Sequence, residues 1–587
     1  MYDSQRHVRQ HLELVNKGDF SYPMSAFDVE TDGFYGEIQE MGCWRDGEVQ
    51  LGFVRFKEMM AAHNGKYDIR VLAEQRRFDG GGPPWMLIDT LAGCALLDEN
   101  SPKGLKGRVK MYGLNEGIPD EVFNKWYELG WLPNMSREEL DVYLTIDIEM
   151  TRRLGLYLWP RLKDEGLLTY WLKLQCPLAF ITAEMESRGI RIDRAELERR
   201  ASTTLDCLNG VEYAIRQAYP GGPWACPKEG CIDGTYHWKR GGKVSICPTC
   251  NGTGINVKVW NSPKQLEEIL FGELGLKSVG ETEAGNNSTS HESLLKLRDQ
   301  GDVTAAIFVH RLMERRKLAN LLTTFYKPYL ESGGDRLHPN LKPFLPRTGR
   351  WSCDSPNLQN IPKAVRSVFI PDEGHAFIKV DYVQLEMYLA GLVYEEPVIL
   401  EAYKNGENLH RRTAEIAGVD YDRGKTINFS FLYGLVPATL ARRLNIGKGE
   451  SHRIYEEVTG GYSALFDGIE RTKAAARRRG YVTTYLGRKR RVPSICSSDF
   501  KERIHAENQV VNARIQGTAA ELINSALIAC KLDIPEAKPL LQVHDEVLFS
   551  VPIDDVEEIM PEIVSIFENA IGGLNPKADA EVQERWG

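Results

Sequence analysis

The sequence predicts a multidomain protein of the mixed α/β class. Its 587 residues exceed what one hydrophobic core holds, and they indicate roughly three to five domains. Residues 1–160 alternate short strand-like runs with helical patterns, and helical patterns dominate from residue 166. From residue 336 onward strands and helices mix. An α/β domain is therefore expected first, followed by a larger second part.

The composition is that of an ordinary globular chain. It is 42% hydrophobic and 26% charged, with no low-complexity tract, which argues against a disordered chain. The first residues contain no apolar signal region, and nowhere do about 18 apolar residues follow one another. A cytoplasmic location without membrane contact is therefore expected.

Positive charge is clustered although the net charge is −9. Residues 471–493 (RTKAAARRRGYVTTYLGRKRRVP) carry nine Lys or Arg and no acid, and residues 314–330 add Arg315, Arg316, Lys317 and Lys327. Either cluster alone fits a solvated helix face. Two clusters interleaved with tyrosines favour contact with a polyanion backbone.

The individual elements follow from hydrophobic periodicity. Strands are expected at SAFDVE (25–30), VQLGFVRF (49–56) and WMLID (85–89), and a helix at 136–158. Further helices are expected at 178–189, 194–219 and 262–276, interrupted by a Gly- and Cys-rich segment at 220–256. Loop residues dominate at PRTGRWSCDSPNLQNIP (346–362).

The stretch LLQVHDEVLFSV (540–551) places His544, Asp545 and Glu546 inside an apolar hairpin pattern. A buried, unpaired carboxylate is costly, so such a group is usually paired or bound to metal. The strand pattern HAFIKVDY (375–382) delivers a second acid, Asp381, at its end. Acids from two neighbouring strands can hold two divalent ions for an in-line displacement at phosphorus.

Between these segments lies YDRGKTINFSFLYG (421–434). On a helix Lys425, Phe429 and Tyr433 share one face, which suits a triphosphate, a base and a sugar. Such a face alone is more often core packing. The order of the three segments is more specific.

These segments resemble motifs A, B and C of the family A (polymerase I type) DNA polymerases. TGRWSCDSPNLQNIP (348–362) resembles the primer-contacting loop, NARIQGTAAEL (512–522) a further signature, and SPKQLEEILFGELGL (262–276) the thumb. The resemblance implies a right-hand polymerase domain over 166–587. Its thumb would span about 180–335, and palm and fingers about 336–587, with fingers at about 395–495.

The resemblance also implies roles for individual residues. Asp381, Asp545 and the Tyr382 carbonyl would hold two Mg²⁺ or Mn²⁺ ions, with Glu546 nearby. Lys425 and His410 would contact the triphosphate, Lys425 being the candidate acid for pyrophosphate. Phe429 would stack on the incoming nucleotide, Glu386 with Tyr433 would exclude a ribose 2′-OH, and Gln384 belongs to the same nucleotide site. The residues expected along the primer-template minor groove are Arg350, Asn512, Gln516 and His544.

Three positions depart from the motifs of this family. Motif A usually reads DYSQIELR, and here Val383 stands for the serine and Tyr388 for the arginine. Tyr421 occupies the position of an arginine that usually precedes the motif B lysine, and Arg423 is the nearest cation. Arg423 is therefore the candidate for the missing triphosphate contact, and nucleotide selection is expected to differ from the family norm.

The N-terminal part contains a second set of acids. SAFDVETDG places Asp28 and Glu30 on one face of a strand, HNGKYDIRVL pairs Asn64 with Asp68 on one helical face, and DVYLTIDIEM pairs Tyr143 with Asp147. Each pair alone is more often a surface pair. Together they resemble the three motifs of DEDDy 3′–5′ exonucleases, which implies an RNase H-like proofreading domain over 1–165. The four acids would hold two metal ions, and Tyr143 would orient the attacking water.

Four of the eleven cysteines form the pattern C-x4-C-x15-C-x2-C at Cys226, Cys231, Cys247 and Cys250. In a cytosolic chain this pattern favours a structural Zn²⁺ in a zinc-ribbon-like insertion over disulfides. Nearby basic residues, Lys228, Lys239, Arg240, Lys243 and Lys258, suggest that the insertion holds duplex DNA. Docking of a processivity factor or replisome protein is the alternative.

The expected function is therefore template-directed DNA synthesis from dNTPs on a primer-template, with proofreading, by a monomer. Too few residues precede Asp28 for a 5′-nuclease domain, and this layout resembles phage replicative enzymes, which act in the host cytoplasm. Two rival hypotheses are a nuclease whose C-terminal part only binds DNA, and an architectural DNA-binding protein. The two complete acid sets argue against both. Replication versus repair, and preference for a modified base, stay open.

Overall fold

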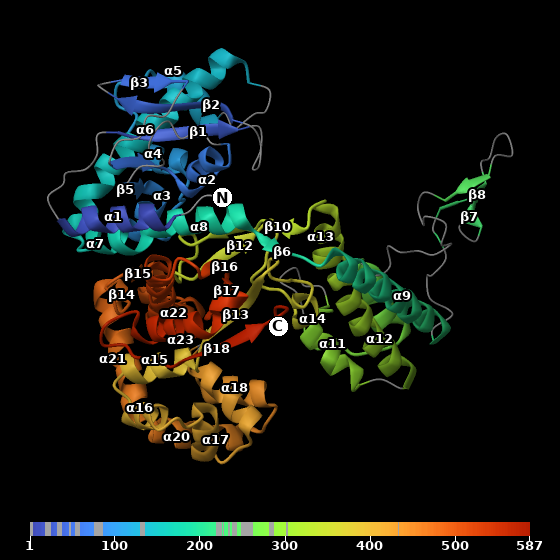
Figure 1. Ribbon diagram of the computed structural model, residues 1–587. Helices are drawn as coiled ribbons and strands as arrows, with labels where there is room; N and C mark the ends of the chain where they lie inside the picture. Colours follow the sequence, from blue (N-terminus) through green and yellow to red (C-terminus); the bar gives the residue numbers. More distant parts are fainter. Residues whose placement is uncertain are drawn as a thin grey trace. The chain divides into compact units, whose positions relative to one another are not determined.

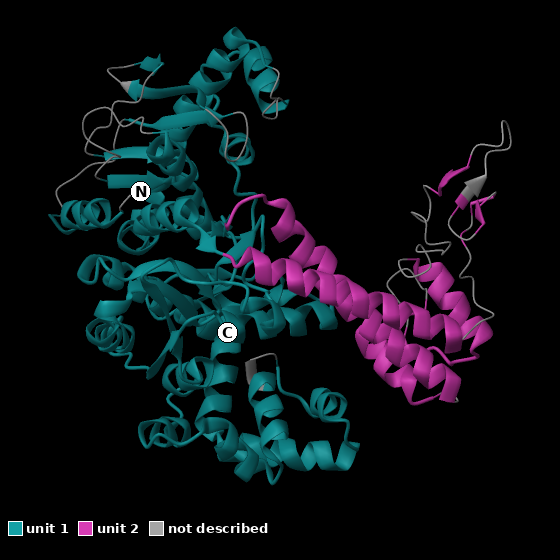
Figure 2. Ribbon diagram, turned by 45° about the vertical axis from the view of Figure 1, so that its right-hand side comes forward, with its two compact units in different colours: residues 1–191, 336–587 teal, residues 192–335 magenta. Residues whose placement is uncertain are grey.

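The computed structural model describes most of the chain in two compact units. The units are residues 1–191 with 336–587 (unit 1) and residues 192–335 (unit 2), shown in two colours in Figure 2. The described residues are 4–17, 25–31, 38–45, 48–52, 59–75, 86–128, 135–218, 226, 228–229, 231–232, 235–237, 244–247, 262–280, 287–300, 303–432 and 434–587.

The first part of unit 1 is a mixed sheet with helices (Figure 1). β1 (Phe27–Thr31), β2 (Ile38–Arg45) and β3 (Glu48–Leu51) are antiparallel, and β4 (Met59–Ala62) and β5 (Met86–Asp89) are parallel. A parallel bridge between Ala26 and Ala61 joins the two groups in the order β3-β2-β1-β4-β5. The RNase H-like domain expected for residues 1–165 stays a prediction.

Helices cover this sheet. The long α6 (Arg137–Asp164) begins at a capping box, in which the Ser136 and Glu139 side chains each accept from the other residue's backbone N–H, and it packs against β2 and α3. The other helices are α1 (Gln5–Lys17), α2 (Lys66–Glu74), α3 (Thr90–Leu97), α4 (Leu105–Tyr112) and α5 (Asp120–Glu128).

A helical segment connects this part to the rest of unit 1. It comprises α7 (Leu168–Tyr170), the π-helix η1 (Trp171–Gln175) and α8 (Cys176–Arg188). Nearly every residue of α8 is buried, so this helix belongs to the core of unit 1. Unit 2 begins at residue 192, whereas the thumb is expected from about residue 180. β6 (Ile190–Arg191) pairs with β10 (Arg336–Leu337).

The second part of unit 1 is built on a four-stranded antiparallel sheet in the order β16-β17-β13-β18. Its strands are β16 (Lys538–Val543), β17 (Glu546–Pro552), β13 (His375–Tyr382) and β18 (Ala578–Gln583). α23 (Val556–Asn569) contacts this sheet and packs on the long α22 (Phe500–Asp533). This sheet lies within residues 336–587, where palm and fingers are expected.

The remaining elements of unit 1 are short strands and helices, and most of these helices lie between β13 and α22 in the chain, where the fingers are expected (Figure 1). The strands are β11 (Asn340–Lys342), β12 (Ser352–Asp354), β14 (Tyr481–Thr483) and β15 (Lys489–Arg491). The helices are α14 (Lys363–Arg366), α15 (Leu385–Val393), α16 (Pro397–Lys404), α17 (Leu409–Ala417), α18 (Tyr421–Leu432), α19 (Pro437–Leu444), α20 (Lys448–Gly461), α21 (Ser463–Arg479), η5 (Pro493–Cys496) and η6 (Ile553–Asp555).

Unit 2 is helical with one small sheet. α9 (Arg194–Ala218) packs along α12 (Val303–Asn320), and Ile215, Leu266 and Phe308 belong to their shared apolar core. The other helices are α10 (Pro263–Glu267), η3 (Glu268–Glu273), α11 (His291–Arg298), η4 (Leu321–Tyr326) and α13 (Lys327–Glu331). The antiparallel strands β7 (Cys231–Ile232), β8 (Thr235–His237) and β9 (Val244–Ile246) lie between α9 and α10 in the sequence.

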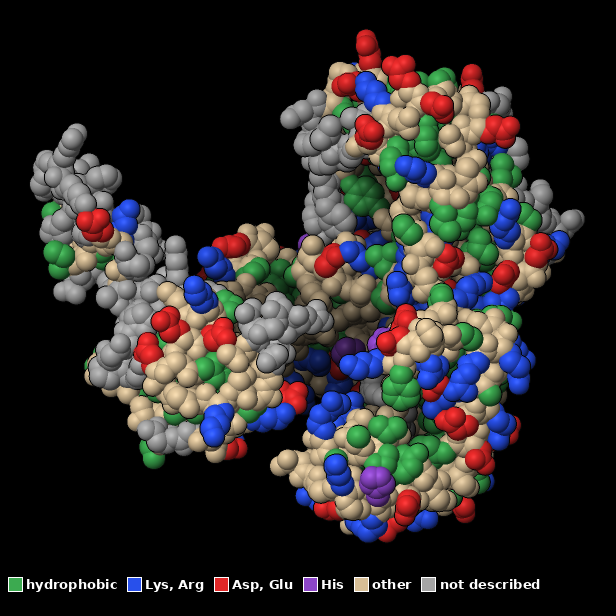
Figure 3. All heavy atoms as spheres, turned by 180° about the vertical axis from the view of Figure 1, so that it is seen from behind, with side chains coloured by type: hydrophobic (Ala, Val, Ile, Leu, Met, Phe, Trp, Pro, Cys, Tyr) green, Lys and Arg blue, Asp and Glu red, His purple; other side chains and the backbone are tan. Residues whose placement is uncertain are grey.

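The expectation that both basic clusters form polyanion-binding surfaces is partly wrong. Lys489, Arg490 and Arg491 make ion pairs with acids of the first part of unit 1, and Arg315 pairs with Glu212 at 2.9 Å inside unit 2. On the face drawn in Figure 3, acidic and basic side chains are interspersed. Within the part of the chain that the structure describes, no helix combines the length and apolar character needed to cross a membrane.

Candidate active sites

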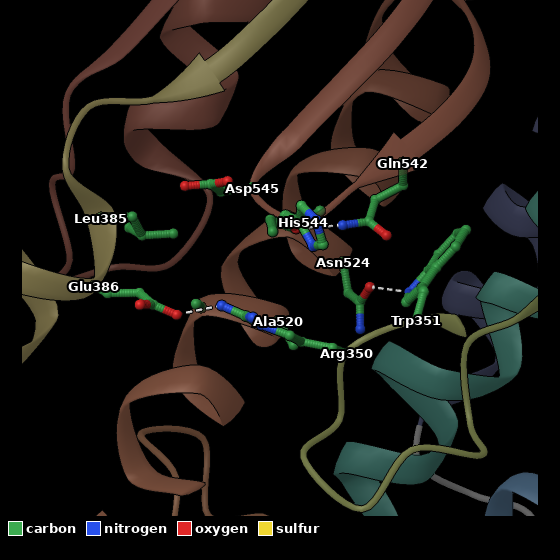
Figure 4. Close-up of a pocket in the computed structure, with 11 residues that line it drawn as sticks. Arg350, Trp351, Leu385, Glu386, Ala520, Asn524, Gln542, His544 and Asp545 are labelled. Carbon is green, nitrogen blue, oxygen red and sulfur yellow. Dashed lines mark hydrogen bonds and ion pairs between the residues drawn. The ribbon is translucent and has the colours of Figure 1, made fainter. Parts of the chain in front are cut away.

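The acids of the predicted hairpin lie at the tip of β16 and β17. Val543 pairs with Glu546, so His544 and Asp545 form a two-residue turn. His544 has a φ of 57°, a value that residues other than glycine rarely adopt outside such turns. Gln542 fixes this conformation because its amide donates to the His544 carbonyl (Figure 4). Asp545 is thereby held at the tip of the β16–β17 hairpin.

Asp381 lies beside this turn. In the sheet register it stands opposite Glu546 on β17 and Asp579 on β18. The pKa of Asp381 is raised to about 7. Burial is the largest cause, and repulsion from the neighbouring Asp545 and Glu546 carboxylates adds to it. Burial also raises the pKa of Asp545. Asp381 Oδ1 is buried without a hydrogen-bond partner among the described residues, as expected for an atom that binds a cation.

Glu546 differs from the other two acids because protein groups already satisfy it. Its Oε1 accepts from Trp586 Nε1 at 2.7 Å, and its Oε2 lies 3.4 Å from Arg366 Nη1. The Arg366 guanidinium lies 4.6 Å from the centre of the fully buried Trp586 ring. Sequence reasoning missed Trp586 and Arg366, because neither lies within the recognised motifs.

Asp381 and Asp545 border a cleft of about 500 Å³. Arg350 and Glu386 both line this cleft and form an ion pair with each other (Figure 4). Burial raises the pKa of Glu386, and Arg350 and a hydrogen bond with Gln516 oppose this effect. The cleft lining is Arg350, Asp381, Tyr382, Gln384, Leu385, Glu386, Met387, His410, Lys425, Asn428, Phe429, His544 and Asp545.

One face of α18 closes the opposite side of the cleft. Lys425 and Phe429 both point into it, and the Phe429 ring is 45% exposed, which leaves an apolar surface open to a flat ligand. Asn428 Nδ2 donates to His410 Nδ1 at 2.8 Å, so neutral His410 carries its proton on Nε2. Burial, then Lys425, lower the pKa of His410. Tyr433 lies outside the described residues.

Arg423 does not occupy the place expected for it. It is absent from the cleft lining and lies within 3.4 Å of Asp420 and 3.6 Å of Glu450. The reason is helical geometry, since a residue two positions from Lys425 points to the other side of α18. The expectation that Arg423 replaces the missing triphosphate contact is therefore not supported.

Tyr388, which replaces the usual motif A arginine, turns away from the cleft. Its ring stacks on Tyr403 with centroids 4.3 Å apart, and its hydroxyl accepts from the Asn575 backbone at 3.1 Å. The Tyr403 hydroxyl donates to the Val383 carbonyl at 3.1 Å and accepts from Lys577 N at 2.6 Å. This aromatic pair ties the turn after β13 to the segment before β18.

The predicted minor-groove residues are distributed along this wall. Arg350 and His544 line the cleft, and Gln516 reaches Glu386 from α22. Asn512 Oδ1, also on α22, is buried without a hydrogen-bond partner among the described residues. Their contact with a primer-template stays a prediction.

The second acid set forms a cluster in the first part of unit 1. Carboxylate oxygens of Asp28, Glu30 and Asp147 lie within 4.8 Å of one another. Asp68, on α2, accepts from Val29 N at 3.0 Å and is hydrogen-bonded to Asp28. Asn64 does not share a helical face with Asp68, because α2 begins at Lys66 and Asn64 has a φ of 66°.

Burial and mutual repulsion dominate the electrostatics of this cluster. Burial raises the pKa of Asp28 to about 6. The pKa of Glu30 rises to about 9, mainly through burial and then through repulsion by the Asp28 and Asp147 carboxylates. The pKa values of Asp68 and Asp147 rise in the same direction, first through burial and then through Asp28. Such a cluster suits divalent cations, which would replace the missing positive charge.

Two further residues, which the sequence did not indicate, complete the cluster. Trp126 Nε1 donates to Asp147 Oδ1. Lys106 Nζ lies 4.6 Å from the centre of the Tyr143 ring and donates to the Trp126 carbonyl at 2.7 Å. No motif spacing marks them, because α4 and α5 bring them to α6 only in the folded chain.

The four-stranded sheet with its acid pair and the facing helix α18 form a cleft whose side chains suit divalent cations and a phosphorylated ligand. A model described as DNA polymerase family A matches residues 249–587. DNA polymerase I of Rhizobium leguminosarum is 33% identical over 454 residues, covering 73% of this chain and 41% of that protein. DNA polymerase I of Synechocystis is 29% identical over 631 residues, covering 95% of this chain and 59% of that protein.

Among solved structures, the "POL domain of Pol1" from M. smegmatis, in complex with a DNA primer-template and dNTP, is similar. Its TM-score is 0.77 at 23% identity, and the alignment covers 100% of this chain and 98% of that one. The chain spans about two fifths to three fifths of the length of the two curated relatives. Because the family model matches more than half of the chain, the chain belongs to DNA polymerase family A.

Proposed function

We propose that this chain extends a DNA primer by template-directed addition of dNTPs. The observation that carries the proposal is the cleft that joins Asp381 and Asp545 to Lys425 and Phe429. Acids stand on one side, where a primer 3′-OH and an α-phosphate would meet. A cation and an exposed ring stand on the other side, where a triphosphate and a base would bind.

Asp381 and Asp545 fit a pair of divalent cations because their charges repel and Asp381 Oδ1 has no partner among the described residues. Two Mg²⁺ or Mn²⁺ ions would lower the pKa of the attacking hydroxyl and stabilise the leaving oxygen. Lys425 would neutralise the triphosphate and donate a proton to the leaving pyrophosphate. His410 would donate from Nε2 to a phosphate oxygen, and Phe429 would stack under the base.

We further propose that the acid cluster of the first part of unit 1 removes mismatched 3′ nucleotides. The close approach of Asp28, Glu30 and Asp147, with Asp68 hydrogen-bonded to Asp28, supports this activity. Asp28, Glu30, Asp68 and Asp147 would hold two divalent cations. Tyr143, at the edge of the cluster, would orient the attacking water.

A phage replicative role, a processivity partner and a monomeric state stay predictions. The relatives named above are bacterial, so they do not support the phage assignment. The proposed grip of the insertion on duplex DNA depends on Lys239, Arg240, Lys243 and Lys258, which lie outside the described residues.

Two substitutions test both activities at once. Asp545→Ala should reduce primer extension with four dNTPs and Mg²⁺ by at least ~10³-fold while 3′ trimming continues. Asp28→Ala should do the reverse. The two variants are controls for each other, since a folding defect would lower both activities. Extension that survives Asp545→Ala would refute the polymerase assignment, and trimming that survives Asp28→Ala would refute the exonuclease assignment.

A further inference from the structure

Unit 2 carries a group of thiols that neither proposed active site uses. Cys226 precedes β7, Cys231 is its first residue, and Cys247 directly follows β9. The three Sγ atoms lie within 4.8 Å of one another, although as many as 21 residues separate them along the chain. The three short strands therefore gather the thiols at one point.

The spacing of the sulfur atoms distinguishes a metal site from a disulfide. Cys226 Sγ and Cys247 Sγ are 3.8 Å apart. A disulfide requires about 2.05 Å. Thiolates that bind zinc tetrahedrally at a Zn–S distance of about 2.3 Å are separated by about 3.8 Å, the length of the tetrahedron edge. The observed separation fits the metal.

The apolar side chains that the structure describes in these strands are mostly exposed. Ile232, Val244 and Ile246 are 61%, 53% and 73% exposed, whereas Cys247 is fully buried. These apolar side chains are thus open to solvent, while Cys226 and Cys231 are half-buried. A sheet this small needs a cross-link or a metal to be stable.

We propose that Cys226, Cys231 and Cys247 bind a structural Zn²⁺ ion. Each thiol loses its proton to solvent when it binds, so the site forms as three Zn–S bonds with release of three protons. Zinc keeps its oxidation state, so no oxidant or reductant is required. Tetrahedral thiolate sites also suit an iron–sulfur cluster, which the colour of the protein distinguishes. Cys250 lies outside the described residues, and its part is left to the experiment.

Elemental analysis of the purified full-length protein tests the site. The expected result is about one zinc ion per chain, with loss of most of it in Cys226→Ser and in Cys247→Ser. Cys207→Ser is the matched control, because Cys207 lies exposed on α9 in the same unit. Retention of zinc in Cys250→Ser would mean that a different group completes the coordination of the three thiolates.

Two measurements on the unmutated protein test the site even if the variants misfold. Replacement of zinc by Co²⁺ should give the strong absorption of tetrahedral cobalt thiolates. Thiol titration should count additional reactive cysteines after a chelator is added, whereas a disulfide would need a reductant. A colourless protein without zinc above the buffer level, iron in its place, or equal zinc loss in Cys207→Ser would overturn the proposal.

Discussion

Two residues with a left-handed backbone stand next to the acids of the cleft. His544 precedes Asp545, and Gln384, with a φ of 49°, follows shortly after Asp381. Such conformations cost about 1–3 kcal/mol unless neighbours enforce them. Here Gln542 holds the His544 carbonyl, and Leu409 N donates to Gln384 Oε1 at 2.8 Å. The strain directs both acids to one point and turns the chain into α15.

Sugar selectivity is expected to depend on Glu386 and Phe429. Glu386 is held in the cleft wall by Arg350, where a ribose 2′-OH would meet it. Glu386→Ala should therefore raise rNTP incorporation relative to dNTP by at least about tenfold, or about 1.4 kcal/mol. Phe429→Tyr should favour dideoxynucleotides, because its hydroxyl would stand near the missing 3′-OH. Single-nucleotide insertion kinetics measure both ratios.

Two variants outside the cleft serve as controls for these substitutions. Glu415→Ala removes an exposed acid of α17, and Phe500→Tyr adds a hydroxyl to an exposed ring of α22. Neither should change the ratios. Unchanged selectivity in both cleft variants would mean that the replacements at 383, 388 and 421 have rebuilt the nucleotide site.

Among the elements, α22 connects several parts of unit 1 through a buried acid. Glu521 accepts from the Thr484 hydroxyl and, at 3.0 Å, from Leu486 N, so it anchors the loop that joins β14 to β15. Burial raises the pKa of Glu521 from 4.5 to about 7, and the hydrogen bond from Thr484 opposes this rise. The helix thus carries an acid that takes up a proton near neutral pH.

This pKa predicts how stability changes with pH. Because the folded value exceeds the unfolded value of 4.5, the folded state binds more protons between these values, and the free energy of unfolding falls as the pH rises through this window. The loss attributable to Glu521 is at most about 3 kcal/mol. Wild type should therefore lose more in Tm than Glu521→Gln between about pH 5 and 8. An equal loss in both proteins would contradict the raised pKa.

At the scale of the whole molecule, local motifs and long-range contacts differ in how well the sequence predicts them. The positions of Asp381, Asp545 and Lys425 in one cleft were predictable, because each lies in a short segment whose strand or helix pattern fixes its direction. The role of Arg490 was not predictable. Its partner, Glu99, lies 391 residues away, and nothing in either segment indicates the other.

The same difference explains the other mistaken expectations. A run of basic residues shows charge, but it does not show whether acids from elsewhere in the fold neutralise it. Arg423 was assigned because it is the cation nearest to Tyr421 along the chain, whereas the turn of α18 decides which side it faces. Trp586, which follows β18, donates a hydrogen bond to Glu546, and no spacing rule would connect it to the hairpin.

The contact between Glu99 and β15 links the two halves of unit 1. Glu99 lies 3.2 Å from both Arg490 and Arg491, and the Glu99 and Arg490 side chains are almost fully buried. Asn100 adds a hydrogen bond of 3.0 Å to the Arg491 carbonyl. Removal of the charge of Glu99 would leave Arg490 buried without an ionic partner, which is more costly than loss of an exposed pair.

Glu99→Gln should therefore destabilise the protein by about 3–5 kcal/mol. Glu165→Gln is the matched control, since Glu165 also pairs with Lys489 and Arg491, at 2.7 and 2.8 Å, but its side chain is 35% exposed. It should cost at most about 1 kcal/mol, because solvent and salt screen such pairs. Chemical denaturation followed by tryptophan fluorescence gives both values. If the two variants lose the same stability, the buried pair does not hold the first part of unit 1 to β15, and apolar packing between them must do so instead.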